Sequence, residues 1–236
     1  MIKNIIVSTV IAVFCAGGIA AKNHVKPLFY CSFDRDAWDP NDWIMVKSSR
    51  WDHFGKWVQS DAYIQNKTPA DALPEAMISS RAAETYTSMV LAKKFVPDIT
   101  IRSTMEFTYQ MAPLIVIAPE LGRDDKGRPE YREHFEVIIY DKGINIWHHN
   151  FKDGKPWWKK IAESRFALKP NTQYDLMVTI SKNQHGKMIS VLVDGHHIGI
   201  LSESFPDQFH VGITGCEGDN HFYNFQVEKG SQVDPH

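Results

Sequence analysis

The sequence has no excess of positive charge, since 26 Lys and Arg residues stand against 28 Asp and Glu residues. A mildly acidic chain offers no electrostatic surface for nucleic acid or anionic lipid, so we expect neither as a partner. Internal repeats, low-complexity tracts and Pro/Ser-rich linkers are also absent after residue 20. A chain of this length without such divisions predicts one domain with one sizeable core, over residues 21–236.

Long apolar runs are missing except near the N-terminus, where Ile5–Ala16 is too short to predict a membrane span. Lys3 precedes this run and Gly18-Ile19-Ala20 follows it, which is typical of a cleavable signal peptide over residues 1–20. An uncleaved anchor is the alternative. The signal peptide predicts a secreted or periplasmic protein that does not contact the membrane after cleavage.

Helical periodicity is nearly absent, and only Pro69–Ala76 is expected to form a helical turn. Short β-type runs separated by turn residues predict an all-β, antiparallel two-sheet sandwich of the jelly-roll kind. The charged segment Gly122–Arg132, which contains Gly and Pro, predicts a surface loop. The expected strands are Leu28–Phe33, Met77–Ser80, Ser88–Phe95, Ile99–Gln110, Leu114–Ala118, His134–Tyr140, Ile144–Asn150, Tyr174–Ser181, Met188–Val193, His197–Leu201, Phe209–Thr214 and Phe222–Val227.

The C-terminal strands carry the most informative pattern. Asp194-Gly195 separates two alternating apolar runs, which is the pattern of a tight β-hairpin. A Val-Gly-Ile-Thr-Gly strand at Phe209–Thr214 and an aromatic strand at Phe222–Val227 follow. In this order the segments resemble the last strands of concanavalin A-like lectin/glucanase sandwiches. The resemblance implies that fold and a carbohydrate partner, because most members of that superfamily handle carbohydrates.

Two cysteines, Cys31 and Cys216, remain after the predicted cleavage. An even pair in an exported protein predicts a disulfide, and the resemblance implies that the first and last strands are neighbours. Two buried thiols are the alternative, because Cys packs well as a small apolar residue.

Successive side chains of a strand point to opposite faces of the sheet, so the central strands can be divided by parity. One face is apolar, with Ile101, Met105, Phe107, Phe135, Val137, Ile139, Ile144 and Ile146. The other face carries Arg102, Glu106, His134, Glu136, Tyr140, Asn145, Trp147 and His149. The resemblance implies that this polar face is a concave groove for a glycan, and a plain solvated face is the alternative.

Two reactions suit the polar face. A retaining glycosidase needs two carboxylates about 5–5.5 Å apart. Glu133 and Glu136 cannot supply them, because a spacing of three sends them to opposite faces, and the strand motif of laminarinase-type relatives is missing. Glu106 and Glu136 share the predicted polar face, so a pair of carboxylates across strands keeps hydrolysis open.

A polysaccharide lyase needs a Tyr or His that removes the proton α to a uronate carboxylate, with cationic or amide groups that neutralise the carboxylate. We expect Tyr140 and His149 to be the acid/base pair, with His134 as a further candidate. Arg102 and Asn145 would then hold the acidic sugar. The alginate-lyase strand motifs are absent.

Aromatic side chains supply further candidate sugar-binding groups. Trp147 lies on the predicted polar face, and Trp157-Trp158 follows Asp153-Gly154 in an expected loop, where indole rings stack on sugars. The stretch Glu133–Asp141 also resembles, over few residues, the central strand of secreted 3-keto-disaccharide hydrolase-like domains.

Metal-ligand spacing is weak. The neighbours in His148-His149 and in His196-His197 point to opposite faces of a strand, so neither pair predicts a zinc site. Calcium is the ion that fits better, because carboxylates flank the first and last strands at Asp34, Glu217 and Asp219, although solvated acidic turns are the preferred explanation. We therefore expect no cofactor other than a structural calcium ion.

The sequence favours an exported protein that acts on a polysaccharide or oligosaccharide; a uronate-containing glycan would explain Arg102, and a neutral glycan is the alternative. A lyase or hydrolase that uses the polar face is preferred over a non-catalytic carbohydrate-binding module.

Overall fold

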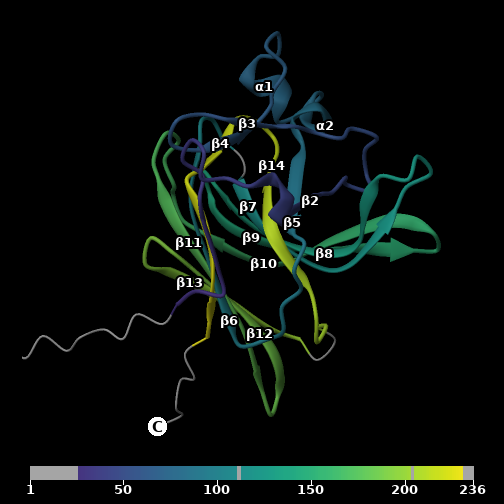
Figure 1. The fold of residues 1–236 in the computed structure, drawn as a ribbon, viewed down its shortest axis with the longest axis vertical. Helices are drawn as coiled ribbons and strands as arrows, with labels where there is room; N and C mark the ends of the chain where they lie inside the picture. The colour runs from purple at the N-terminus through teal and green to yellow at the C-terminus, as the bar shows by residue number, and fades with distance from the viewer. Residues whose placement is uncertain (1–25, 111–112, 203–204, 231–236) are drawn as a thin grey trace, which may run out of the picture.

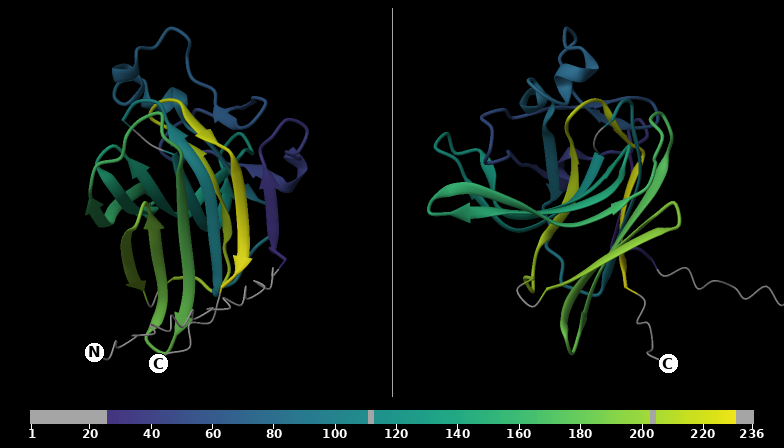
Figure 2. Two further views of the ribbon diagram at one scale, coloured as in Figure 1. Left: turned by 90° about the vertical axis from the view of Figure 1, so that its left-hand side faces the viewer. Right: turned by 180° about the vertical axis from the view of Figure 1, so that it is seen from behind.

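A computed structural model describes residues 26–110, 113–202 and 205–230, so the predicted signal peptide over residues 1–20 lies outside the described residues. The described chain forms two antiparallel sheets that pack face to face, which confirms the predicted β-sandwich (Figures 1 and 2). None of the helices in the described part is long and apolar enough to cross a membrane.

Sheet A has nine strands in the order β13-β12-β11-β6-β15-β4-β3, with β16 paired to both β6 and β1. Its strands are β1 (Phe29–Ser32), β3 (Trp57–Gln59), β4 (Ile64–Asn66), β6 (Ile99–Phe107), β11 (Tyr174–Asn183), β12 (Gly186–Val193), β13 (His196–Ser202), β15 (Asn220–Phe222) and β16 (Asn224–Lys229).

Sheet B has seven strands in the order β10-β9-β8-β7-β14-β5-β2. Its long hairpins extend to one side of the sandwich (Figure 2, right). The strands are β2 (Trp43–Met45), β5 (Thr87–Leu91), β7 (Pro113–Arg123), β8 (Pro129–Tyr140), β9 (Gly143–Lys152), β10 (Lys155–Arg165) and β14 (His210–Gly215). The short helices are η1 (Pro40–Asp42), α1 (Pro74–Met77) and α2 (Ala82–Thr85).

The core lies between the sheets and takes the side chains that strand parity assigns to the apolar face. Ile101, Met105 and Phe107 of β6 are fully buried there, as are Val137 and Ile139 of β8. Fully burying a large aliphatic or aromatic side chain contributes about 1.5–3 kcal/mol. The alternation therefore fixes which face of each strand turns inward.

The predicted Asp-Gly turn is confirmed at the β12–β13 hairpin. Asp194 and Gly195 both have positive φ, at 48° and 75°, and Val193 pairs with His196 across the turn. The β9–β10 turn has the same character, with Asp153 at 51° and Gly154 at 72°. A type I′ turn requires these left-handed conformations, which Gly and Asp tolerate.

Three sequence predictions about local structure are wrong. Residues 122–132 are mostly strand, because β7 runs to Arg123 and β8 begins at Pro129, and the Asp124 side chain accepts hydrogen bonds from two backbone amides of the short turn between them. Residues 77–80 are not a strand, since Met77 ends helix α1 and a turn follows. The expected loop at Trp157-Trp158 belongs to β10.

The predicted disulfide between Cys31 and Cys216 is not formed. β1 does pair with β16, as expected for first and last strands, but Cys216 follows β14 in sheet B. Cys31 packs in the core between the sheets, and Cys216 packs in a second apolar cluster. The two thiols therefore lie in different clusters.

The second apolar cluster covers the outer face of sheet B. Leu114, Val116 and Ala118 of β7 belong to it, whereas Ile115 and Ile117 point into the main core. The segment that follows β2 lies over this face, because Lys47 forms a bridge to Glu130 of β8 and its ammonium group bonds the Glu130 carboxylate at 2.6 Å. This overlying segment turns part of the outer face into a cavity wall.

Candidate functional site

A cavity of about 190 Å³ opens on the outer face of sheet B. Strands β8, β9 and β10 form its floor, the segment after β2 forms one wall, and the turn after β14 closes another side. The residues that line it are Ser48, Arg50, Trp51, Tyr86, Glu136, Ile138, Asn145, Trp147, His149, Trp158, Cys216 and Glu217.

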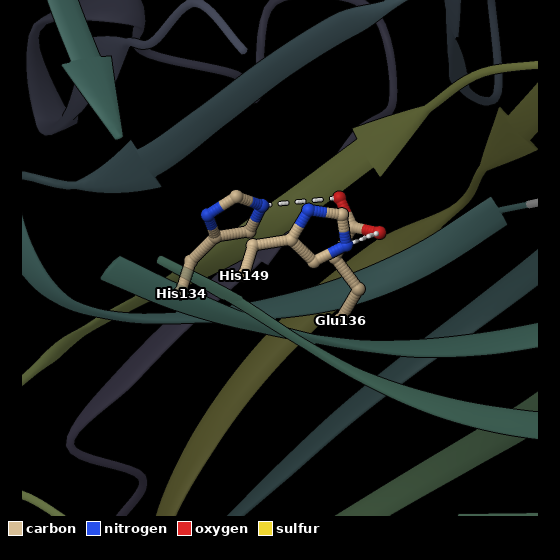
Figure 3. Close-up of side chains that lie close together, drawn as sticks. All are labelled: His134, Glu136 and His149. Atoms are coloured by element: carbon tan, nitrogen blue, oxygen red, sulfur yellow. Dashed lines mark hydrogen bonds and ion pairs between the residues drawn. The ribbon is translucent and has the colours of Figure 1, made fainter. Parts of the chain in front are cut away.

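Two histidines hold the carboxylate of Glu136, as Figure 3 shows. His134 Nε2 is hydrogen-bonded to Glu136 Oε1 at 3.2 Å, and His149 Nε2 lies 3.1 Å from Glu136 Oε2. β8 brings His134 and Glu136 to one face by their spacing of two, and the β8–β9 register places His149 directly opposite His134. All three side chains are buried, so their rotamers are fixed by packing.

Aromatic rings form a continuous wall beside this carboxylate. Tyr131, His134, His149 and Trp158 follow one another, with centroid separations of 4.3, 4.5 and 6.4 Å. Trp158 is 44% exposed, so the wall reaches solvent at the mouth of the cavity. Of these rings, His149 and Trp158 line the cavity, where they offer ring faces with polar groups beside them to a ligand that is itself partly apolar.

The two carboxyl groups of the cavity have pKa values shifted in opposite directions. Burial opposes ionisation of Glu136, but His149 and His134 outweigh it and hold its pKa well below the usual range. Burial raises the pKa of Glu217, and the nearby charge of Glu136 raises it further. One carboxyl group is thereby kept ionised while the other is biased toward its protonated form, which is the arrangement needed for paired acid and base roles.

Glu217 is held in a strained backbone conformation, with φ at 55°, and Gly218 follows at 121°. Non-Gly residues rarely adopt positive φ, and such strain persists only where the surroundings enforce it. The Glu217 amide donates to Thr85 Oγ1 at 2.7 Å, and the buried Asn66 side chain donates to the Gly218 carbonyl at 2.8 Å. These bonds hold the turn in the position that brings the Glu217 carboxyl group to the cavity.

His134, Glu136 and His149 also form the one group of His, Cys, Asp or Glu residues, among those described, whose ligand atoms lie within 4.8 Å of one another. The two imidazoles are stacked at 4.5 Å with an interplanar angle of 22°, so their in-plane lone pairs run nearly side by side. Each ring already meets a separate oxygen of Glu136. This geometry suits the orientation of a carboxylate better than the chelation of one ion.

Several predicted site residues do meet here. Glu136, Asn145, Trp147, His149 and Trp158 all line the cavity. His134 supports Glu136 from beneath, at 2% exposure. The parity argument thus placed these residues of β8 and β9 on one face, and the structure brings them together there.

Arg102 and Glu106 are the main corrections, because both lie in β6 of sheet A rather than in sheet B. Arg102 pairs with Glu228, and Glu106 pairs with His221 on β15. Both side chains alternate with the inward-facing residues of β6, so they point away from the sandwich on the opposite side of the molecule. Glu106 and Glu136 therefore cannot act as a catalytic pair.

Tyr140 and His149 do not meet either. His149 pairs with His134, whereas Tyr140 pairs with Gly143. Tyr140 lies six residues after His134 on β8, so it is about 20 Å along the strand from the position of His149. The Tyr140 hydroxyl donates to Glu163 on β10 at 3.1 Å. The preferred acid/base pair from the sequence is therefore wrong.

Trp157 pairs with Asn150 and, being next to Trp158, faces the other side of β10. The calcium candidates do not converge: Glu217 lines the cavity, while Asp219 accepts a hydrogen bond from Thr68. Asp34 contributes its backbone carbonyl to Gln59. Among the described residues, none of these three carboxylates belongs to a group of at least three His, Cys, Asp or Glu side chains whose ligand atoms lie close together.

Arg50, Trp51 and Tyr86 were missed by sequence reasoning. They lie where no strand periodicity exists, and they reach the cavity only because their segments fold over the outer face of sheet B. Glu217 was noticed only as a calcium candidate. The sequence signal that could have indicated a functional role for Glu217 is its place in a Glu-Gly turn shortly after a buried strand.

We expect acid to destabilise the fold through His134. Burial lowers the pKa of His134 from 6.5 to about 4, so the unfolded chain binds the proton more readily. The contribution of neutral His134 to the free energy of unfolding, about 3 kcal/mol, is complete above pH 6.5 and is lost as the pH falls from 6.5 toward 4. Urea unfolding of the wild type and of His134→Gln at pH 7, 5.5 and 4 measures this. The free energy of unfolding of the variant should change less with pH than that of the wild type. Equal pH dependence in the two proteins would contradict the assignment of this effect to His134.

No protein-family model matches this sequence, and no curated protein matches it either. Several solved structures share its fold. A structure described with endo-acting O-glycanases of the human gut microbiota that initiate mucin breakdown has a TM-score of 0.58 at 11% identity, covering 87% of this chain and 100% of that one. The κ-carrageenase of Pseudoalteromonas carrageenovora has a TM-score of 0.52 at 10% identity, covering 88% and 98%.

The carbohydrate-binding module CBM66 of Bacillus subtilis has a TM-score of 0.51 at 14% identity, with 79% of this chain and 95% of the module covered. At such low identities these structures establish the architecture alone. The chain has the concanavalin A-like lectin/glucanase sandwich fold that its C-terminal strands resemble.

Proposed function

We propose that this protein is a glycoside hydrolase that holds a sugar residue in the cavity of sheet B. The observation that carries the proposal is the pair formed by Glu136 and Glu217, which line one cavity and have pKa values shifted in opposite directions. Glycosidases use two carboxyl groups in this way, one protonated and one ionised.

Glu217 is the general acid. In its protonated form it gives a proton to the glycosidic oxygen as the bond to the anomeric carbon breaks. Glu136, kept ionised by the two histidines, is the second carboxylate, which activates water or attacks the anomeric carbon. His134 and His149 position Glu136 by holding one carboxylate oxygen each.

The size and lining of the cavity support a saccharide. At about 190 Å³ it is smaller than the sites of about 300–1,000 Å³ that hold drug-sized ligands, so we expect one sugar residue to enter. Trp147 and Trp158 supply ring faces, and Asn145 supplies an amide. Neighbouring folds include a carrageenase and a carbohydrate-binding module, which agrees with this ligand class. From residues 1–20 we further propose that the protein acts after export.

Elimination fits the cavity less well than hydrolysis. Tyr140 is remote, and burial holds the pKa of Tyr86, the tyrosine that lines the cavity, well above its usual value. A tyrosine in that state is a poor proton acceptor at neutral pH. His149, the other candidate base, lines the cavity but lies against the Glu136 carboxylate at 3.1 Å, so the acid/base chemistry is assigned to the two glutamates.

A panel of neutral, uronate-containing and sulfated polysaccharides tests the function. We expect new reducing ends without the ultraviolet absorbance of an unsaturated uronate. That absorbance would show elimination and contradict the proposal. Binding without product would instead support a non-catalytic module. If the protein neither binds nor cleaves any of these glycans, a role of this cavity with them is excluded.

A further inference from the structure

Arg50 differs from every other arginine of the described chain in that no hydrogen bond or ion pair engages its side chain, although its charge acts on the Glu217 carboxyl group and opposes the rise of that pKa. No hydrogen bond or ion pair joins its guanidinium group to another described residue, and only its backbone amide is bonded, to Ser48 Oγ. Each of the others meets a carboxylate or a carbonyl oxygen. These pairs are Arg35–Asp61, Arg81–Glu84, Arg102–Glu228, Arg123–Gly127, Arg128–Asp124, Arg132–Glu130 and Arg165–Glu163.

Two indole rings nevertheless fix the position of the Arg50 side chain. Its guanidinium carbon lies 4.4 Å from the ring centroid of Trp51 and 4.4 Å from that of Trp158. Cation–π contacts of this kind orient the guanidinium plane while its N–H groups remain available in that plane. The arginine is thus pre-organised at the mouth of the cavity without having its donors satisfied by the described protein.

The cavity otherwise carries the negative charge of Glu136, whose pKa the two histidines hold well below the usual range. An anionic sugar would be repelled from this site unless a cation received its charged group. Arg50 is the one lysine or arginine among the described residues that line the cavity, and guanidinium binds carboxylate or sulfate oxygens through paired N–H donors.

We infer that Arg50 is the receptor for an anionic group on the bound sugar, so that the substrate is an acidic glycan. The inference rests on the proposed function for the location of the sugar, and it deepens that function by naming the substrate class. A uronate carboxylate and a sulfate ester share the required chemistry. Arg50 replaces Arg102 as the residue that holds the acidic group.

Calorimetric binding to the inactive Glu217→Gln protein tests this inference without turnover. The probes are polygalacturonate and its methyl ester, κ-carrageenan and its desulfated form, and a neutral β-glucan. We expect one acidic polymer to bind at least about 10-fold more tightly than its uncharged counterpart, because charge-assisted paired hydrogen bonds are lost with the charge. Binding of polygalacturonate would identify the anionic group as a uronate carboxylate, and binding of κ-carrageenan would identify it as a sulfate ester.

The Arg50→Gln substitution in the same background should abolish that preference, and Arg50→Lys should recover only part of it because lysine lacks the planar donor pair. Arg102→Gln on sheet A, which removes another exposed arginine, should change nothing. Equal binding of charged and uncharged glycans, an unchanged preference in Arg50→Gln, or no Arg50-dependent binding of either acidic polymer would overturn the inference.

The test separates this inference from the proposed function. Cleavage of neutral glycans by the wild type would support hydrolysis while refuting the role of Arg50. Binding of an acidic glycan that depends on Arg50, without cleavage by the wild type, would refute hydrolysis while supporting the acidic ligand.

Discussion

Glu217→Gln is expected to lower the turnover of a natural glycan by about 10²- to 10⁴-fold, the usual contribution of a general acid. Gln keeps the size of the side chain but has no proton to donate to the departing oxygen. Glu136→Gln should lower the turnover by at least the same factor, because the reaction then loses its ionised carboxylate. Initial rates of reducing-end formation measure both effects.

The two variants should differ with an activated substrate. A dinitrophenyl glycoside of the cleaved sugar needs no protonation of its leaving group, so Glu217→Gln should regain most of its turnover with it and Glu136→Gln should not. Wild-type activity should fall at high pH as Glu217 loses its proton and at low pH as Glu136 gains one. With the activated substrate, Glu217→Gln should lose the fall at high pH.

Glu133→Gln is the matched control. Glu133 lies on the same strand as Glu136 and also pairs with a histidine, His148 at 2.8 Å, but it faces the other side of sheet B. Its replacement should leave turnover within a factor of two or so. Full activity in Glu217→Gln with the natural glycan, in a protein that remains folded by circular dichroism, would refute the assignment of the acid.

Asn66→Ala is expected to have the largest effect on stability, lowering the free energy of unfolding by about 3–5 kcal/mol. Asn66 is fully buried, and its amide group donates to the carbonyls of Thr85 and Gly218, both at 2.8 Å. Its Oδ1 accepts from the backbone amide of Asn220 at 2.9 Å. Alanine would leave two buried backbone groups, the Thr85 carbonyl and the Asn220 amide, without these partners, would leave the Gly218 carbonyl with only its bond from the Asn220 side chain at 3.0 Å, and would open a small cavity.

The same substitution should also reduce turnover, because the turn from Cys216 to Asn220 positions Glu217. Urea unfolding gives the stability and steady-state kinetics at a temperature where the variant is folded give kcat. Asn41→Ala is the control, since Asn41 is exposed and bonds only to Asp39. A loss below 1 kcal/mol with unchanged kcat would show that the turn is held by other contacts.

The sequence by itself determined the sandwich, the hairpin turns and the face of each long strand. These features depend on local rules: Asp194-Gly195 supplies the left-handed conformations of a tight turn, and alternation in β8 sends Glu136 to one side and Val137 to the other. The same rules correctly excluded Glu133 as a partner of Glu136.

Only the tertiary structure decided which residues share the site. Parity gives the side of a strand but neither its sheet nor its register, so Arg102 was assigned to the wrong sheet and Tyr140 was placed too near His149. Strand pairing depends on contacts between distant segments, which no local pattern encodes. Arg50 and Glu217 reach the cavity through segments that lack strand periodicity, and only the packing of those segments on sheet B brings them beside Glu136.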